Sequence, residues 1–207
     1  MKLRRLAYLV LIISGLARAQ TPPEAEFVLR AQSTTPFEVL YPNQHTRGQP
    51  WIRISLASQT LILYDALGRA LRQFSISSAK LGAGERVDSY QTPRGWHQIC
   101  AKIGDDAAAD SIIYHRQVTP WHYSAELHAQ YPDRDWILAR ILWLCGMEPG
   151  KNQGAEVDSH DRAIYIHGAG SHVAFGTPTS RGCVRMRIQD VIELYQAVPL
   201  GTDVDIE

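Results

Sequence analysis

The chain contains 207 residues, of which 45% are hydrophobic and 20% are charged. This composition is typical of a globular protein, and the length is sufficient for one domain with a substantial core. Lysine and arginine together number 21, equal to the 21 aspartates and glutamates. The chain therefore lacks the basic excess of a nucleic-acid-binding protein, and we expect no nucleic-acid partner.

The first 19 residues have the pattern of a secretory signal peptide. Three basic residues, Lys2, Arg4 and Arg5, precede an apolar run at 6–16, and Ala-Arg-Ala at 17–19 is the small-x-small pattern that a signal peptidase cuts. We expect cleavage after Ala19 and a periplasmic location. The alternative is an N-terminal anchor that stays attached.

Removal of this segment takes away four basic residues and no acidic one, which leaves 17 basic against 21 acidic residues. The mature protein is then mildly acidic. The apolar run is shorter than the roughly 20 residues needed to cross a bilayer, and no later stretch is apolar for long enough. We therefore expect no stable membrane insertion.

Short β-strands are predicted after a proline-rich, polar stretch at 20–49, which we interpret as an extended lead-in. Apolar and polar residues alternate at 51–56 and at 71–77, and a short apolar run at 61–64 lies between them. These segments predict three antiparallel strands, and 96–101 predicts another strand after a Thr-Pro-Arg-Gly turn.

Residues 104–162 have no clear period and predict a loop-rich insertion. Within it, 136–144 is almost wholly apolar, which fits either a buried strand or one short buried helix. His115, His122 and His128 are interpreted as loop or surface residues. A role for His122 in a substrate groove is the alternative.

The C-terminal part predicts the only clear helix. Residues 163–166 predict a strand, and 204–206 a final one. Between them lies the stripe of a helix that packs one face on the core, formed by Ile188, Val191, Ile192 and Tyr195. The sequence thus predicts one mainly β domain over 50–207 with a single C-terminal helix packed on the sheet.

The chain has three cysteines, an odd number, so at most one internal disulfide can form. If Cys183 is free, Cys100 and Cys145 are the candidate pair. Both lie in apolar, strand-like runs, where buried cysteines behave as small hydrophobic residues. We therefore favour two reduced thiols, because the geometry of a disulfide cannot be read from the sequence.

Cys183 and His167 have the pattern of a nucleophile and its base. A thiol attacks as its thiolate, so a cysteine enzyme needs a base or a cation beside the sulfur. Gly182 has no Cβ to block a substrate carbonyl, and Arg185 supplies a fixed positive charge two residues beyond the sulfur. The competing interpretations are an inert buried thiol and a hydrogen-bonded core histidine.

A metal site is another interpretation of the histidines that precede Cys183. His160, His167 and His172 lie within a short stretch, but they lack the close ligand pairs that zinc sites normally use. We therefore expect no metal site.

These residues resemble the catalytic domain of the L,D-transpeptidases of the YkuD type, which are bacterial cell-wall enzymes. The family motif places His-Gly upstream of Ser-x-Gly-Cys-apolar-Arg or -Asn, and here His167-Gly168 precedes Ser-Arg-Gly-Cys-Val-Arg at 180–185. The hairpin at 51–76 and the Thr-Pro-x-Gly turn at 92–95 also match. Many members have a second histidine where this chain has Arg181.

The resemblance implies a YkuD-like β-sandwich and an acyl-transfer activity on peptidoglycan tetrapeptide stems. Cys183 would attack the carbonyl between meso-diaminopimelate and D-alanine, and His167 would take the thiol proton. The carbonyl of Gly168 would orient the imidazole, while backbone groups of Gly182 and Cys183 would form the oxyanion hole. No metal or organic cofactor is implied.

The resemblance also implies that the segment around the thiol contacts the substrate through Ser180, Arg181, Gly182 and Arg185. Arg185 would bind a substrate carboxylate or brace the loop. Arg181 would depress the pKa of the thiol or extend into solvent as an ordinary surface residue.

Three functions remain open from the sequence. Transfer of the acyl group to an amine, on a second stem or on a protein, makes an L,D-transpeptidase. Transfer to water makes an L,D-carboxypeptidase. A murein-binding domain without turnover is the third.

Overall fold

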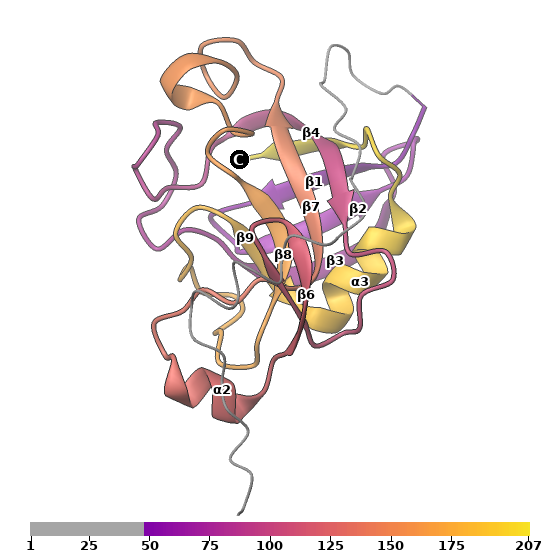
Figure 1. Ribbon diagram of the computed structural model, residues 1–207. Helices are drawn as coiled ribbons and strands as arrows, with labels where there is room; N and C mark the ends of the chain where they lie inside the picture. Colours follow the sequence, from indigo (N-terminus) through magenta and orange to yellow (C-terminus); the bar gives the residue numbers. More distant parts are fainter. Residues whose placement is uncertain (1–47) are drawn as a thin grey trace, which may run out of the picture.

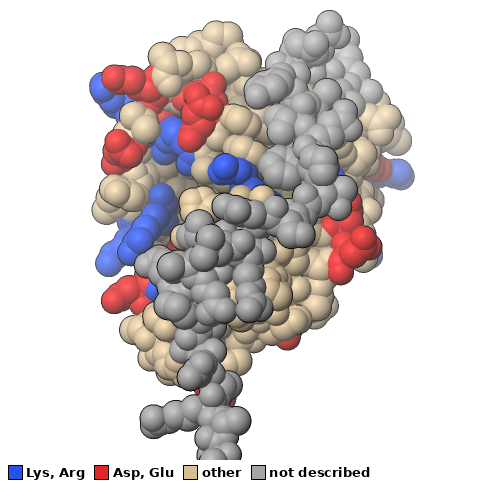
Figure 2. Space-filling model, in the orientation of Figure 1, with Lys and Arg blue, Asp and Glu red and all other residues tan. Residues whose placement is uncertain are grey.

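The computed structural model describes residues 48–207. The predicted signal peptide at 1–19 and nearly all of the lead-in at 20–49 lie outside these residues. No helix of the described part has the length and hydropathy of a membrane span. On the face shown in Figure 2, basic and acidic side chains are interspersed.

The domain is built from ten strands and a helix that packs against them (Figure 1). The strands are β1 (Trp51–Ser55), β2 (Thr60–Tyr64), β3 (Ala70–Ser77), β4 (Gly95–Ile103), β5 (Ser111–Tyr114), β6 (Gln117–His122), β7 (Leu138–Gly146), β8 (Tyr165–Ala169), β9 (Val184–Arg187) and β10 (Asp203–Ile206). The helices are α2 (Ala125–Gln130) and α3 (Ile188–Ala197), with one 3₁₀ turn at Ala155–Val157. The predicted mainly β architecture with one helix packed on the sheet is confirmed.

The sheet closes on itself. Its strand order is β4-β10-β1-β2-β3-β9-β8-β7-β5-β6, and β4 pairs with β7 as well as with β10. Figure 1 shows β7 and β8 in front of β1 and β2, so the closed sheet has two layers. The side chains of Ile52 and Leu61 from one layer meet those of Leu144 and Ile166 from the other in the main core.

Strand β7 settles the ambiguous apolar run at 136–144, which forms a strand from Leu138 onward. The strand is buried along its whole length because both faces are covered. Leu142 and Leu144 contribute to the main core, on which α3 packs. Ile141, Trp143 and Cys145 contribute to a second cluster on the opposite face, and Cys183 packs against that cluster.

The insertion at 104–162 contains more regular structure than the sequence predicted. Besides β7 it contains the β5–β6 hairpin and the six-residue helix α2. The side chain of Ser124 caps α2 by accepting a hydrogen bond from the Leu127 amide at 3.1 Å. Ile113 and Val118 of the hairpin pack in the second cluster, so the insertion covers that face of β7.

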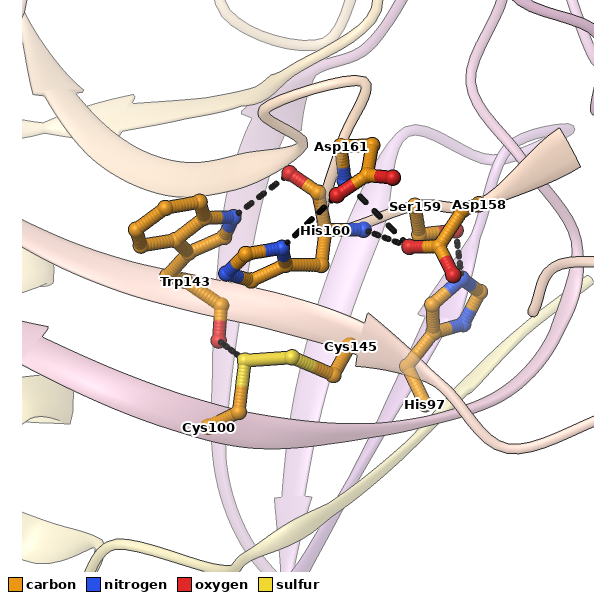
Figure 3. The surroundings of a disulfide bond; sticks show 8 residues. All are labelled: His97, Cys100, Trp143, Cys145, Asp158, Ser159, His160 and Asp161. Atoms are coloured by element: carbon orange, nitrogen blue, oxygen red, sulfur yellow. Dashed lines mark hydrogen bonds and ion pairs between the residues drawn. A yellow bond between two sulfur atoms is a disulfide. The ribbon is translucent and has the colours of Figure 1, made fainter. Parts of the chain in front are cut away.

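Cys100 and Cys145 form a disulfide between β4 and β7, with their Cα atoms 5.7 Å apart (Figure 3). The preference for two reduced thiols was wrong. Two apolar strands that are distant in sequence bring the cysteines together, because Gln98 and Cys145 are cross-strand partners and a register shift follows at Cys100. Cys183 is the free cysteine.

We expect the disulfide to stabilise the fold substantially, because it closes a loop with a sequence separation of 45 residues. Replacing both Cys100 and Cys145 by alanine should lower the free energy of unfolding by about 4 kcal/mol in the chain-entropy model. In denaturant without reductant, the unaltered protein should expose one reactive thiol, and Cys183→Ala should expose none. Titration of three thiols in the unreduced protein would contradict the pairing.

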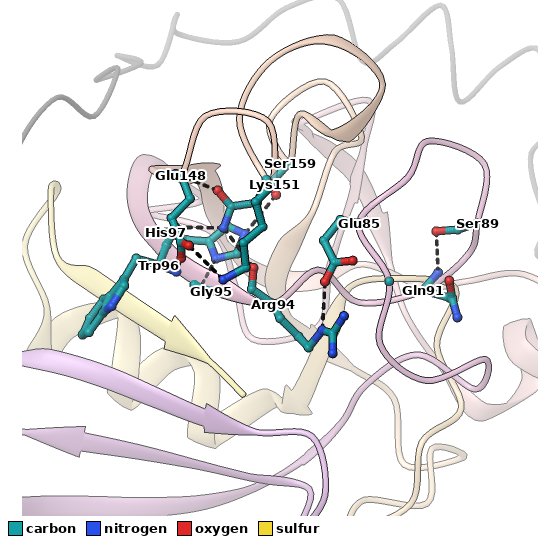
Figure 4. Close-up of polar contacts among 12 residues, drawn as sticks. Glu85, Ser89, Gln91, Arg94, Gly95, Trp96, His97, Glu148, Lys151 and Ser159 are labelled. Atoms are coloured by element: carbon teal, nitrogen blue, oxygen red, sulfur yellow. Dashed lines mark hydrogen bonds and ion pairs between the residues drawn. The ribbon is translucent and has the colours of Figure 1, made fainter.

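His97 in β4 is fully buried beside the connection that follows β7 (Figure 4). Its Nδ1–H donates to the carbonyl of Gly95 at 2.9 Å, so its Nε2 accepts from the hydroxyl of Ser159, also at 2.9 Å. Burial lowers the pKa of His97 to about 4. The folded state therefore holds this ring neutral at pH values where the unfolded chain would protonate it.

Acid should destabilise the protein through His97. The pKa of His97 is lower in the folded protein than the unfolded value of about 6.5. The free energy of unfolding therefore keeps its full value above pH 6.5 and decreases as the pH falls toward 4. The loss should reach about 3 kcal/mol for this group. Urea unfolding at pH 7.5 and 4.5 measures it. His97→Gln should flatten the dependence; parallel curves for both proteins would exclude His97 as its cause.

Candidate active site

The parallel pairing of β8 with β9 places the two motif residues on neighbouring segments of the sheet. His167 lies opposite Arg185, and Ile166 lies opposite Val184. Cys183 precedes β9 directly, at the level of Tyr165, whose backbone N–H lies 3.4 Å from Sγ. His167 and Tyr165 pair with Ile141 and Trp143 of β7. Because opposed residues share a face, the site lies on the side of the sheet away from the main core.

His167 is fully buried, and its two ring nitrogens have different surroundings. Nδ1 lies 2.9 Å from the carbonyl of Gly168 and must donate to it, so the neutral ring carries its lone pair on Nε2. Nε2 has no hydrogen-bond partner among the described residues. Burial lowers the pKa of His167, which keeps the ring neutral near pH 7. An uncharged, unpartnered Nε2 can accept a proton.

Gly168 is required to be glycine by the close approach of β7. A Cβ at this position would lie 2.6 Å from the carbonyl oxygen of Leu138, which is backbone and cannot give way. The absence of a side chain therefore lets β8 sit tightly against β7 while its carbonyl holds the imidazole.

Cys183 is half-buried, and its sulfur lies 3.4 Å from the carbonyl oxygen of Ala163 as well as 3.4 Å from the Tyr165 amide. Burial and the negative charge of Asp135 raise the pKa of the thiol to about 12, although Arg185 and Arg162 oppose this. The sequence analysis predicted a base or a cation beside the sulfur, with His167 as the base and depression of the thiol pKa by Arg181 as one alternative. The resting pair is instead a neutral thiol and a neutral imidazole.

Asp135 is the residue of this site that the sequence analysis missed. Its carboxylate pairs with the guanidinium of Arg185 at 2.8 Å. Burial alone would raise the pKa of Asp135, but the charge that His167 carries once it is protonated in acid, and the charge of Arg185, hold it below its usual range. The residue follows the short helix of the insertion and has no local sequence signal that points to the motif, so only the fold reveals it.

One terminal nitrogen of Arg185 is occupied by the ion pair with Asp135. The residue is buried, and its second terminal nitrogen donates to the hydroxyl of Thr179 at 3.2 Å. The guanidinium thus links the insertion to the loop before the thiol, which corresponds to the bracing role among the two predicted for it. Arg181 is exposed and lowers the pKa of Asp135, but it is not among the groups that shift the pKa of Cys183.

The loop before Cys183 is fixed by internal hydrogen bonds. The hydroxyl of Ser180 donates to the carbonyl of Cys183 at 2.5 Å and accepts from the Gly182 amide at 3.2 Å. The hydroxyl of Thr92 donates to the carbonyl of Gly182 at 2.8 Å. Gly182 adopts a φ of +136°, which favours glycine.

Two expectations for this loop change as a result. Ser180 is only 2% exposed, so in this conformation it holds the loop rather than facing a substrate. The amide of Gly182 was expected in an oxyanion hole with that of Cys183, but it donates its hydrogen bond to the hydroxyl of Ser180. It could serve an oxyanion only if that bond were released.

The histidines do not assemble around Cys183. The ring of His160 stacks on that of Trp143 at 4.1 Å, while His172 accepts from the hydroxyl of Tyr123 at 2.9 Å and stacks on His128 at 3.8 Å. His122 pairs with Asp110 at 2.8 Å.

Within residues 48–207, the group whose side chains lie close enough for a cation is Asp158, His160 and Asp161 (Figure 3). Oδ1 of Asp158 already accepts from the backbone amides of His160 and Asp161, at 2.9 and 3.2 Å. This is the arrangement of a turn, in which the carboxylate satisfies nearby amides.

Comparison with known proteins identifies one family. The model of the L,D-transpeptidase catalytic domain, YkuD, matches residues 49–206. A probable L,D-transpeptidase of Escherichia coli, ErfK/SrfK, is 23% identical over 176 residues, which cover 85% of this chain and 49% of that protein. The putative L,D-transpeptidase YkuD of Bacillus subtilis is 44% identical over 59 residues, 28% of this chain and 36% of its own.

The chain thus spans about half the length of the first of these relatives. Among solved structures, an L,D-transpeptidase from Xylanimonas cellulosilytica aligns with a TM-score of 0.44 and 19% identity, covering 81% of this chain and 65% of that one. An L,D-transpeptidase from Mycobacterium smegmatis aligns with a TM-score of 0.46 and 15% identity, covering 77% and 58%.

The neutral thiol should be visible in its alkylation kinetics. Because the thiolate is the reactive form and the pKa of Cys183 is raised to about 12, the rate with iodoacetamide should rise about tenfold per pH unit from pH 7 to 10 without a plateau. Asp135→Asn should increase the rate, since it removes a charge that raises this pKa. Cys183→Ala is the unlabelled control. A plateau below pH 8 would reveal a preformed thiolate.

Proposed function

The chain belongs to the YkuD family of L,D-transpeptidase catalytic domains, and we propose that it is an exported cysteine acyl-transfer enzyme acting on peptidoglycan tetrapeptide stems. The proposal rests above all on one observation. Cys183 has a free thiol, and His167 on the neighbouring strand has an unprotonated Nε2 without a partner among the described residues.

The first step is nucleophilic attack with proton transfer. Nε2 of His167 takes the thiol proton as the sulfur of Cys183 attacks the carbonyl between meso-diaminopimelate and D-alanine. A carbon–sulfur bond forms, and the tetrahedral oxyanion receives hydrogen bonds from backbone amides near Cys183. The carbon–nitrogen bond then breaks, the imidazolium returns the proton to the departing D-alanine amine, and a thioester remains.

The neutral pair suits this order of events. A thiol with a pKa of about 12 is a poor nucleophile by itself, so its proton must leave during the attack. The hydrogen bond from Nδ1 to Gly168 and the charge of Asp135 both favour the imidazolium that forms at this moment. Asp135 thereby opposes a resting thiolate but stabilises the protonated base.

The second step decides the outcome. An amine that attacks the thioester gives a cross-link or an attached protein, whereas water gives a tripeptide. We propose transfer to an amine as the function, with hydrolysis by the same nucleophile as the alternative. Export fits the predicted signal peptide at 1–19 and the Cys100–Cys145 disulfide, because such bonds persist in oxidising compartments.

Incubation of the purified protein with a disaccharide tetrapeptide tests the proposal. Cross-linked dimers with release of D-alanine are expected. Tripeptide without dimers would indicate a carboxypeptidase, and no release of D-alanine would indicate a domain that binds murein without turnover.

Two substitutions test the assigned residues in the same assay. Cys183→Ala should abolish the release of D-alanine, and His167→Gln should slow it about a hundredfold or more, the range of general-base contributions. Both variants should keep the disulfide, which non-reducing thiol titration verifies. Activity retained in Cys183→Ala would remove the nucleophile assignment.

A further inference from the structure

The tip of the β5–β6 hairpin places an arginine against Tyr165, the residue whose backbone amide contacts the proposed nucleophile. Tyr114 pairs with Gln117, which leaves His115 and Arg116 as the two central residues of the turn. A terminal nitrogen of Arg116 lies 3.4 Å from the hydroxyl of Tyr165, and its guanidinium stands over the ring of Trp143 at 5.0 Å. Arg116 therefore reaches the site from the insertion.

Tyr165 connects this arginine with the sulfur. Its backbone amide lies 3.4 Å from Sγ of Cys183, while its hydroxyl is the atom near Arg116. Burial raises the pKa of Tyr165, and Arg116 and Cys183 both act on it, with opposite signs. Tyr165 thus contacts the thiol through its backbone amide and the guanidinium through its hydroxyl.

The turn itself is unfavourable for these two residue types. His115 and Arg116 have φ angles of +47° and +64°. A two-residue hairpin turn with positive φ at both positions is best formed by Asn-Gly, and side chains with a larger Cβ substituent meet steric resistance there. Arg116 therefore adopts a backbone conformation that costs free energy for a residue with a large side chain.

Arg116 also differs from Arg185 and Arg162, the two arginines whose charges act on the thiol. Arg185 is paired with Asp135. Arg162 donates to the carbonyls of Glu85 and Gln91 at 2.7 and 2.6 Å. No carboxylate of residues 48–207 pairs with Arg116, whose contacts are with a phenol and an indole. It is a half-buried cation, held in place by aromatic rings, with donors left for an anion.

We propose that Arg116 binds a carboxylate of the stem peptide next to the scissile bond, a role that rests on the proposed function. Such stems offer two carboxylates near that bond, the terminal one of D-alanine and the side-chain one of diaminopimelate. A guanidinium donates to either through two parallel hydrogen bonds. The hairpin then acts as the element that selects acidic stems, while Arg185 braces the loop of the nucleophile.

Binding of a tetrapeptide stem to Cys183→Ala protein tests the proposal without turnover. Adding Arg116→Gln should raise the dissociation constant about tenfold to a hundredfold, which corresponds to the loss of a charge-assisted hydrogen bond. Arg116→Lys should raise it less, because lysine keeps the positive charge. His115→Asn is the matched control. It changes the same turn toward a better turn former without altering charge, so binding should stay unchanged.

Three stems distinguish the two carboxylates: the native stem, one ending in D-alaninamide, and one amidated on the diaminopimelate side chain. The effect of Arg116→Gln should disappear for the stem that lacks the bound carboxylate. An equal effect on all three stems, or none on the native stem, would overturn the proposal. Turnover of the native stem by the unaltered protein tests the proposed function separately, so failure of one is distinguishable from failure of the other.

Discussion

The parallel register between β8 and β9 is the constraint on which the rest of the site depends. It sets Arg185 opposite His167 and brings Cys183 to the level of Tyr165. A slip of one residue would send the thiol and the imidazole to opposite faces, because side chains alternate along strands. The register is fixed from both sides, by buried apolar residues of the main core and by the bonds that hold the loop at 180–183.

Charge and burial around these two strands keep the thiol of Cys183 protonated. The apolar cluster at β7 and the carboxylate of Asp135 both disfavour a thiolate. Because oxidation also proceeds through the thiolate, a protonated Cys183 is protected in the oxidising compartment that we propose for it. The imidazole of His167 is neutral because it is buried as well. In the proposed mechanism, the thiol proton moves to this imidazole when the substrate is bound.

Much of this organisation could be predicted from the sequence where the signal is local. Alternation predicted the strands near 51–77, and the apolar stripe predicted α3. Of the motif residues, His167 lies on β8 and Cys183 directly precedes the neighbouring strand β9. What failed depends on contacts between distant segments. The Cys100–Cys145 bond arises from the β4–β7 pairing, and Asp135 meets Arg185 only through the path of the insertion. The sequence separation within each pair does not indicate that the two residues are in contact.

The closure of the sheet by β4 and β7 has a consequence for the association of the protein with neighbouring molecules. A row of unpaired amides and carbonyls at a strand edge invites pairing with neighbouring molecules and hence aggregation. Among the described strands the ring has no open end, because β4 and β7 pair with each other. Unpaired backbone remains on the part of β3 that precedes its pairing with β9 at Ile76 and Ser77, and on β6 at the end of the strand order. That strand contains the exposed Pro120, which has no amide hydrogen to offer. The closed ring thus leaves little of the sheet edge available for pairing with neighbouring molecules.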